Sequence, residues 1–507
     1  MRITFEGEDF AKKELEKFFE TFDLLTESER VPFVGFLESP YFNDEPRIAL
    51  LYQRILDSWG QGSGRMNGRP LLQFVFGDLA EKKAKSLLRK FLKQLPDLLL
   101  TYMDHEEIRT NNLFGDRVRV MQLKKRVDSD LFQGSAARME HTLAGRTPTL
   151  MQLQEYWWLY HQLYFYQYAQ QYDKRDTQRL RNASLYLEDF YQLTSLRYYC
   201  EVLNRERIVG KEKGFESLTQ SAGKFIDETS SRPIIAFYSM LARVLQFPKD
   251  PKIYERFKAY YREYCGELAK PDQLVMIKCV FNVCIRNYEA GNANGPEELI
   301  FWAKEGVVEG VFLFENSLSD KEYLNIAIAA GLAGELAFMK EFVEDYKAKM
   351  EEKIREQAYQ MARIYLDFFG RDLPAVLERL YEYFPPQKSF DPIYTLRSKV
   401  FYILTYLMLC IENMEAPENE EDYDDAFESH MQAYRKYVDR ASFLDEDRRA
   451  PYKKFYNVCQ KVFNYTTGSP DRRTEANKAA ILEMVTDEKA LLGRGVLLAM
   501  IRELKTR

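Results

Sequence analysis

Two stretches in the second half of the chain decide the fold: YLNIAIAAGLAGEL, residues 323–336, and AYQMARIYLDFF, residues 358–369. In both stretches apolar or small residues recur at the spacing i, i+3, i+4, i+7 and i+8, beginning at Leu324 and at Ala358. This periodicity places them on one face of an α-helix. Each stretch is therefore predicted to be an amphipathic helix, and Ala327, Gly331 and Gly334 would let a neighbouring helix approach closely.

Proline and glycine divide the surrounding chain at regular distances. Proline suits the first turn of a helix because its missing N–H has no partner there, and glycine commonly ends a helix. The breakers predict a series of helical hairpins. The predicted helices cover residues 233–247 with 251–268, 271–290 with 296–309, 320–334 with 336–349, 352–369 with 373–385, and then 391–412.

The spacing of these helices predicts how they are arranged. Leu324, Ala358 and Pro392 are separated by 34 residues each and hold comparable places near helix starts. The other hairpins run longer, and periods of this size are typical of stacked helix pairs, none of which can bury its apolar face alone. We therefore predict an all-α fold with an N-terminal helical module and a right-handed α-solenoid of helix hairpins, with a period of about 34–50 residues.

This arrangement resembles tetratricopeptide-like helical repeats, most clearly over residues 320–412 and more loosely over 150–310. The Trp, Leu-Gly, Tyr and Ala consensus positions of that family do not recur in register here. The resemblance therefore implies the architecture, and it does not carry over the peptide-carboxylate clamp of some family members. The peptide LESPYFN, residues 37–43, resembles a motif near the start of uncharacterised helical proteins from Bacteroidetes-type bacteria, which implies no activity.

The first 105 residues differ from the repeats and are predicted to hold shorter helices over 8–22, 27–37, 46–58, 70–79 and 81–102. The charged segment that follows, residues 106–148, carries no long apolar stripe. Further along the chain, EAPENEEDYDDAFE (residues 415–428) is rich in acids. These shifts in composition predict five segments. They are a helical module over 1–105, connecting helices over 106–148, the solenoid over 149–412, an acidic loop over 413–428 and a helical segment over 429–507.

The composition of the chain excludes several classes of protein. Its 507 residues include 72 Lys and Arg against 78 Asp and Glu, a net charge of −6, whereas a protein that coats DNA is normally basic. The N-terminus carries acids where a signal peptide needs an apolar core, and the apolar run at 400–410 is shorter than the about 20 residues of a membrane-spanning helix. We therefore expect a cytoplasmic protein that does not enter a membrane.

Motifs for catalysis or for cofactors are absent from the sequence. The glycine-rich segment 59–70 lacks the Lys-Ser/Thr and the preceding strand of a phosphate-binding loop, and is expected to be a flexible connection. The four histidines and six cysteines show no zinc-ligand spacing, and no GxSxG motif occurs. The cysteines are expected to be buried or half-buried free thiols. We expect no catalytic residue, metal or cofactor, and hence no enzyme.

The helix EYWWLYHQLYFYQYAQ is unusually aromatic and is followed by a basic segment. A helix that is apolar on two sides is usually buried in the core, but the same side chains could line a concave groove that contacts a peptide. Our hypothesis is the groove. The candidate partner-binding residues are Trp157, Tyr160, Tyr164, Arg175 and Arg179.

The predicted function is a non-catalytic scaffold that binds a segment of a partner protein on the concave face of the solenoid, because stacked repeats form extended concave surfaces. The alternative is a nucleic-acid-binding regulator. It would use the N-terminal module or the basic and aromatic segments at 117–126, 174–181 and 448–456, where cations can pair with phosphates and rings can stack on bases. The partner itself cannot be read from the sequence.

Overall fold

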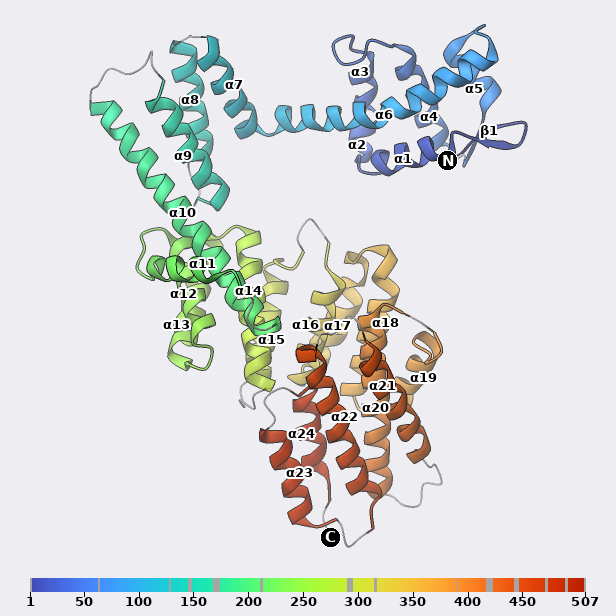
Figure 1. Cartoon of the computed structure of the whole chain (residues 1–507), viewed down its shortest axis with the longest axis vertical. Helices are drawn as coiled ribbons and strands as arrows, with labels where there is room; N and C mark the ends of the chain where they lie inside the picture. The colour runs from blue at the N-terminus through green and yellow to red at the C-terminus, as the bar shows by residue number, and fades with distance from the viewer. Residues whose placement is uncertain are drawn as a thin grey trace. The chain divides into compact units, whose positions relative to one another are not determined.

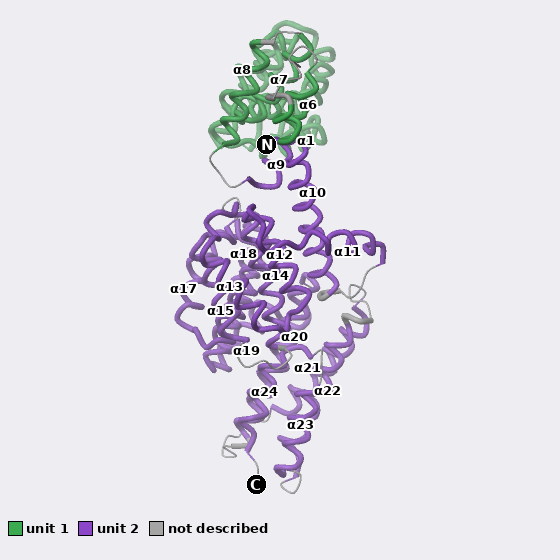
Figure 2. Tube along the Cα trace, turned by 90° about the vertical axis from the view of Figure 1, so that its left-hand side faces the viewer, with its two compact units in different colours: residues 1–144, 158–183 green, residues 145–157, 184–507 purple. Residues whose placement is uncertain are grey.

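The chain is described here from a computed structural model, and its residues form two compact units (Figure 2). The first unit comprises residues 1–144 and 158–183, and the second comprises 145–157 and 184–507. The structure describes residues 2–62, 64–126, 129–144, 148–166, 174–209, 213–289, 295–313, 317–388, 390–415, 423–441, 446–469, 473–487 and 491–505. The fold is all-α apart from one small sheet, which confirms the predicted fold class.

The N-terminal part of the chain alternates short strands and helices before it becomes wholly helical (Figure 1). Its elements are β1 (Arg2–Phe5), β2 (Glu8–Phe10), α1 (Lys12–Phe22), α2 (Glu27–Arg30), α3 (Pro32–Glu38), α4 (Arg47–Gly60), β3 (Arg65–Asn67), α5 (Gly68–Phe76), α6 (Glu81–Thr110), α7 (Asn112–Arg126), α8 (Ser129–Leu143), α9 (Leu150–Tyr164) and α10 (Lys174–Val209). Helices α9 and α10 each contribute residues to both units.

A three-stranded sheet with the order β2-β1-β3 corrects two expectations. The helix predicted over 8–22 begins only at Lys12, because residues 8–10 pair antiparallel with β1. The glycine-rich segment expected to be a flexible connection contains β3, which pairs parallel to β1 with Ile3 opposite Met66. Strands of three or four residues are too short to show a clear alternation in sequence.

Gly68 is the residue that lets the sheet approach helix α5. A Cβ atom at this position would lie 2.3 Å from the ring of Phe5 on β1, closer than any side chain could pack. The preceding Asn67 starts the helix, since its side chain accepts a hydrogen bond from the backbone N–H of Arg69 at 3.1 Å. The end of β3 and the start of α5 are thereby fixed against β1.

A core of phenylalanine, tyrosine and leucine side chains holds this N-terminal module together. Phe18 and Phe22 of α1 pack with Tyr52 of α4, and all three are fully buried. Helix α6 packs along α1 and buries Leu88 and Leu92 one turn apart. After α6, helices α7 and α8 pack against each other.

The regular elements of the second unit are helices in the part of the chain that the structure describes (Figure 1). After α10 its helices are α11 (Glu216–Ala222), α12 (Pro233–Gln246), α13 (Pro251–Tyr264), α14 (Lys270–Glu289), α15 (Gly295–Val308), α16 (Asp320–Leu332), α17 (Leu336–Tyr346), α18 (Glu352–Phe369), α19 (Leu373–Tyr383), α20 (Pro392–Glu415), α21 (Asp424–Arg440), α22 (Glu446–Thr467), α23 (Glu475–Asp487) and α24 (Arg494–Glu503). Short 3-10 turns cover Gly223–Phe225, Cys265–Glu267 and Lys347–Lys349.

Helices α12 to α20 occupy the positions that the breakers predicted, with ends that differ by only a few residues. Helix α12 contacts α13, and each helix from α14 to α19 contacts the next one, as hairpins require. In addition α12 contacts α14, α16 contacts α18, and α18 contacts α20. Gly331 explains one close approach, since an added Cβ would lie 2.1 Å from the ring of Phe369. The small residue allows α16 and α18 to pack tightly.

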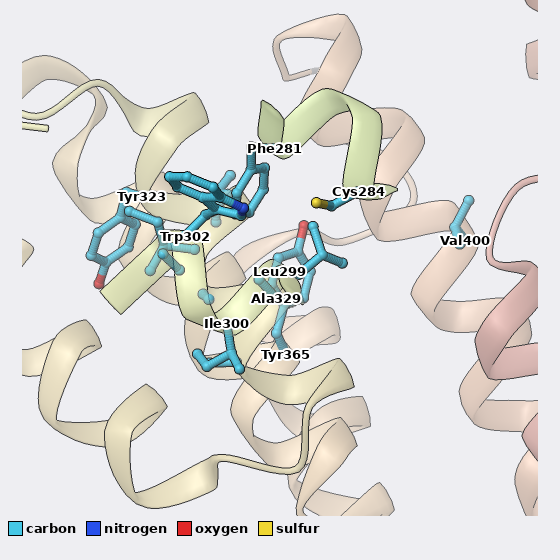
Figure 3. Close-up of a cluster of buried hydrophobic side chains, with 14 of the residues drawn as sticks. Phe281, Cys284, Leu299, Ile300, Trp302, Tyr323, Ala329, Tyr365 and Val400 are labelled. Carbon is cyan, nitrogen blue, oxygen red and sulfur yellow. The ribbon is translucent and has the colours of Figure 1, made fainter. Parts of the chain in front are cut away.

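One continuous cluster of buried side chains runs through this unit. Its largest members include Trp302, Tyr238, Tyr323 and Tyr365, and Figure 3 shows several of them together with Cys284. The cluster extends to the C-terminal helices, because α24 contacts α14 and buries Leu497 and Ile501 and their neighbours. The last helices are therefore part of the core of this unit.

Five of the six cysteines are buried and Cys265 is half-buried, as the sequence predicted. Burial raises the pKa of the Cys279 and Cys284 thiols to about 12, so both stay protonated at neutral pH. No helix within the described ranges is long and apolar enough to cross a membrane. Nor does any group of three or more His, Cys, Asp or Glu in those ranges have the arrangement to hold a metal ion.

Candidate functional site

The aromatic helix α9 packs against its neighbours with most of its rings. Tyr160 is buried, and its hydroxyl donates a hydrogen bond to the carboxylate of Glu140 on α8. Trp157 and Tyr164 are half-buried. The ring of Tyr156 stacks on Tyr186 of α10 with 4.6 Å between ring centroids. At Tyr160 and Tyr156 the helix therefore serves as a packed element of the fold.

Of the two predicted basic residues at the start of α10, the structure describes the side chain of one. Arg179 is half-buried and donates a hydrogen bond to Oε1 of Gln133 on α8 at 2.9 Å. The side chain of Arg175 lies outside the described residues. Gln133 and Glu140 are two turns apart on α8, so Arg179 and Tyr160 contact the same face of that helix. The structure brings these two predicted residues together through α8.

The basic segment on α7 is engaged in local contacts. The guanidinium of Arg117 lies over the ring of Trp158 at 4.7 Å, and Arg119 pairs with Asp116 at 2.6 Å. Lys124 donates a hydrogen bond to Gln162 of α9 at 2.8 Å. In the third basic segment, the side chain of Arg448 lies outside the described residues. The contacts on α7 give its cations a structural role beside any role in binding a phosphate.

Helix α10 carries an exposed apolar row that sequence reasoning did not single out. Leu187, Tyr191 and Tyr198 are 45%, 54% and 61% exposed. Their spacing of i, i+4 and i+11 places them on one face of the helix. The opposite side of α10 packs into the core through Leu193 and Leu196. We call Leu187, Tyr191 and Tyr198 the α10 row.

The surroundings of the α10 row fix its position. The ring of Tyr191 meets Phe225 edge-on with 5.4 Å between centroids, and the side-chain amide of Gln192 donates to the backbone carbonyl of Phe225 at 2.9 Å. The carboxylates of Glu188 and Glu201 flank the row and are exposed. The row is therefore an apolar strip with one exposed carboxylate on each side. Its only signal in the sequence was a second apolar face on a long helix.

A cleft of about 350 Å³ opens where α13, α14 and α15 meet. Pro251, Tyr254 and Glu255 come from α13 or its start, and Cys284 and Asn287 come from α14. The remaining lining residues are Pro248, Lys249, Asp250, Gly295 and Glu298. We call this hollow the α13–α15 cleft. No motif in the sequence could have located it, because its residues come from three helices.

The inner wall of the α13–α15 cleft is a hydrogen-bonded network. The hydroxyl of Tyr254 donates to the carboxylate of Glu298 and accepts a hydrogen bond from the indole N–H of Trp302 at 2.8 Å. Lys258 donates to both carboxylate oxygens of Glu298 at 2.8 and 2.7 Å. The thiol of Cys284 lies 3.5 Å from the same Tyr254 hydroxyl. These bonds hold the wall in one arrangement.

The phenol and the thiol of the cleft wall stay protonated at neutral pH. Burial raises the pKa of the Tyr254 hydroxyl far above its ordinary value, and the hydrogen bonds to Cys284 and Glu298 act in the same direction. The Cys284 thiol, with a pKa of about 12, is a poor nucleophile at neutral pH. The wall therefore offers a protonated phenol, a protonated thiol and a paired carboxylate.

The fold and these surfaces define an all-α protein with packed helical hairpins, an exposed apolar row and a cleft between three helices. No protein-family model matches the chain, and neither a curated protein nor a solved structure matches it significantly. The geometry of the chain itself is therefore the basis for a functional proposal.

Proposed function

We propose that the chain is a non-catalytic scaffold that binds a segment of a partner protein along a solenoid of helix hairpins. The observation that carries this proposal is the α10 row. An exposed row of apolar side chains on one helix face can mark an interaction surface, and Tyr is enriched among interface hot spots. The partner segment is expected to carry apolar side chains for the row.

The charges beside the α10 row refine the chemistry of the partner. Glu188 and Glu201 are exposed on either side of the row. A partner segment with Lys or Arg next to its apolar residues would place opposite charges across the interface, which favours fast and selective association. The predicted contact residues on α9 and α10 stay part of this proposal as a second contact area.

Co-purification from native lysate with variants of the α10 row tests the proposal. The double variant Tyr191→Ala with Tyr198→Ala is expected to lose near-stoichiometric partners, while a circular dichroism spectrum shows an unchanged helix content. Phe247→Ala is the control, because Phe247 is a comparably exposed aromatic residue of the same unit that stands outside the row.

Two results would contradict the scaffold proposal. Partners that are retained equally by the double variant and by Phe247→Ala would show that the row is not the binding surface. Partners that all dissociate after nuclease treatment would favour the nucleic-acid alternative, and their binding should then fall steeply with salt concentration.

A further inference from the structure

The polar groups that line the α13–α15 cleft are mainly hydrogen-bond acceptors. Glu255 is exposed and has no hydrogen bond or ion pair with any described residue. Asp250 caps α13 with Oδ1, which accepts from the backbone N–H groups of Lys252 and Ile253, so its Oδ2 is left for other donors. The amide nitrogen of Asn287 donates to the carbonyl of Pro248 at 2.9 Å, which leaves its Oδ1 as an acceptor.

The net charge of the groups that line the cleft is negative. The carboxylate of Glu298 is neutralised by Lys258, with which it forms two hydrogen bonds. Among the described lining residues, the two carboxylates of Asp250 and Glu255 then outnumber the single ammonium group of Lys249. A cation that enters the cleft therefore meets a net negative lining, whereas an anion is opposed by it.

The shape and rigidity of the cleft suit a compact ligand. A volume of about 350 Å³ is within the range of small-molecule sites, although near its lower end. Pro248 and Pro251 stiffen the backbone on one side, and the network around Tyr254 fixes the other. A site whose walls are held before binding loses little conformational entropy when the ligand enters.

We propose that the α13–α15 cleft binds an organic cation through a guanidinium or primary ammonium group. The cation would pair with Glu255, donate to Oδ1 of Asn287 and Oδ2 of Asp250, and lay its methylene chain along Pro248, Pro251 and the Tyr254 ring. This site does not depend on the α10 row, so it goes beyond the scaffold proposal. The cation is either a free amine or an Arg or Lys side chain, because both present the same group.

Titration calorimetry with agmatine as the probe tests the cleft in the full-length protein. Agmatine carries both groups on a four-carbon chain, and 1,4-butanediol is the neutral probe of the same chain length. Glu255→Gln removes the free carboxylate and is expected to weaken agmatine binding by about tenfold, the size expected for one charged hydrogen bond. Glu263→Gln is the matched control, since Glu263 is exposed on the same helix but does not line the cleft.

A second variant tests whether the weaker agmatine binding comes from the cleft itself. Asn287→Leu removes an acceptor without changing the charge and should also weaken agmatine, while Glu263→Gln leaves the affinity unchanged. Equal weakening by Glu255→Gln and Glu263→Gln would overturn the proposal, as would equal binding of butanediol or no agmatine binding at millimolar concentration. An N-acetylated Gly-Arg-Gly amide peptide that binds as tightly as agmatine would identify a side chain as the source, and one that fails to bind would identify a free amine.

Discussion

The indole nitrogen of Trp302 and the phenolic oxygen of Tyr254 are 2.8 Å apart, and the indole N–H donates to that oxygen. Trp302 is fully buried on α15, whereas Tyr254 lies on α13, so the bond joins two consecutive helical hairpins. The same Tyr254 hydroxyl donates to Glu298 at the wall of the cleft. The packing of these hairpins and the shape of the cleft are therefore linked through one tyrosine.

Trp302→Phe should lower the free energy of unfolding by about 2–4 kcal/mol, because it removes a buried hydrogen bond and leaves a small void. Urea unfolding followed by circular dichroism measures the change. Trp59→Phe is the control: Trp59 is 36% exposed and belongs to the other unit, so its effect should be much smaller. Equal effects of the two changes would mean that the Trp302–Tyr254 bond does not stabilise the second unit.

Gly331→Ala should destabilise the second unit by about 1–3 kcal/mol, because the added Cβ overlaps the ring of Phe369 and forces α16 and α18 apart. Thermal unfolding measures the effect. Gly134 lies within α8, where an added Cβ meets no atom within 4 Å, so Gly134→Ala should be neutral or stabilising through its higher helix propensity. A stable Gly331→Ala variant would contradict the close packing of these two helices.

The hairpins could be predicted from the sequence because their signals are local. The apolar period near Leu324 and breakers such as Pro251 and Pro271 each act within one or two helices. The pairing of Ile3 with Met66 could not be predicted in this way, since it joins short strands far apart in the chain. Gly68 gave no signal of its own, because the Phe5 ring that requires it is brought there by the fold.

The candidate surfaces were predictable only in part, because they depend on how separate helices pack. The aromatic character of α9 was evident, but burial of Tyr160 depends on Glu140 and on the packing of α8. The α10 row lies on a helix that also has a buried face, and the sequence does not show which face is covered. The α13–α15 cleft depends on three helices meeting, which no single segment encodes.

His430 makes the stability of the second unit depend on pH. Its ring stacks on Tyr402 and Tyr406, with centroids 4.2 and 5.3 Å away, and Nε2 lies 3.3 Å from the Tyr381 hydroxyl. Burial, with a smaller effect of the nearby Lys399 ammonium, lowers the pKa of His430 to about 4. Between this value and the ordinary value of 6.5 the unfolded chain binds a proton that the folded chain does not, so stability falls as pH drops through this window.

The His430 contribution should amount to about 1–2 kcal/mol, allowing for screening by solvent at a half-buried site. The measurement is the free energy of unfolding at pH 7 and at pH 4.5 for the wild type and for His430→Phe, whose ring can keep the stacking. The variant should lose less stability on acidification than the wild type by this amount. An identical loss in both proteins would show that His430 is protonated in the folded state.

Tyr160→Ala should destabilise the first unit by about 3 kcal/mol, because it removes a buried ring and leaves Glu140 without that hydrogen bond. Tyr164→Ala should cost less, since Tyr164 is only half-buried. Chemical unfolding of both variants measures the difference. If Tyr160→Ala keeps full stability but loses a partner, Tyr160 is a contact residue as first predicted from the sequence.

The most direct test of the scaffold account is photo-cross-linking from the α10 row in native lysate. A benzophenone amino acid is placed at position 198 and, as the control, at position 247, which holds a comparably exposed aromatic residue outside the row. The account predicts discrete protein adducts from position 198 that resist nuclease, disappear when Leu187 and Tyr191 are changed to serine, and are absent from position 247. No adduct from position 198, or the same adducts from both positions, would contradict it.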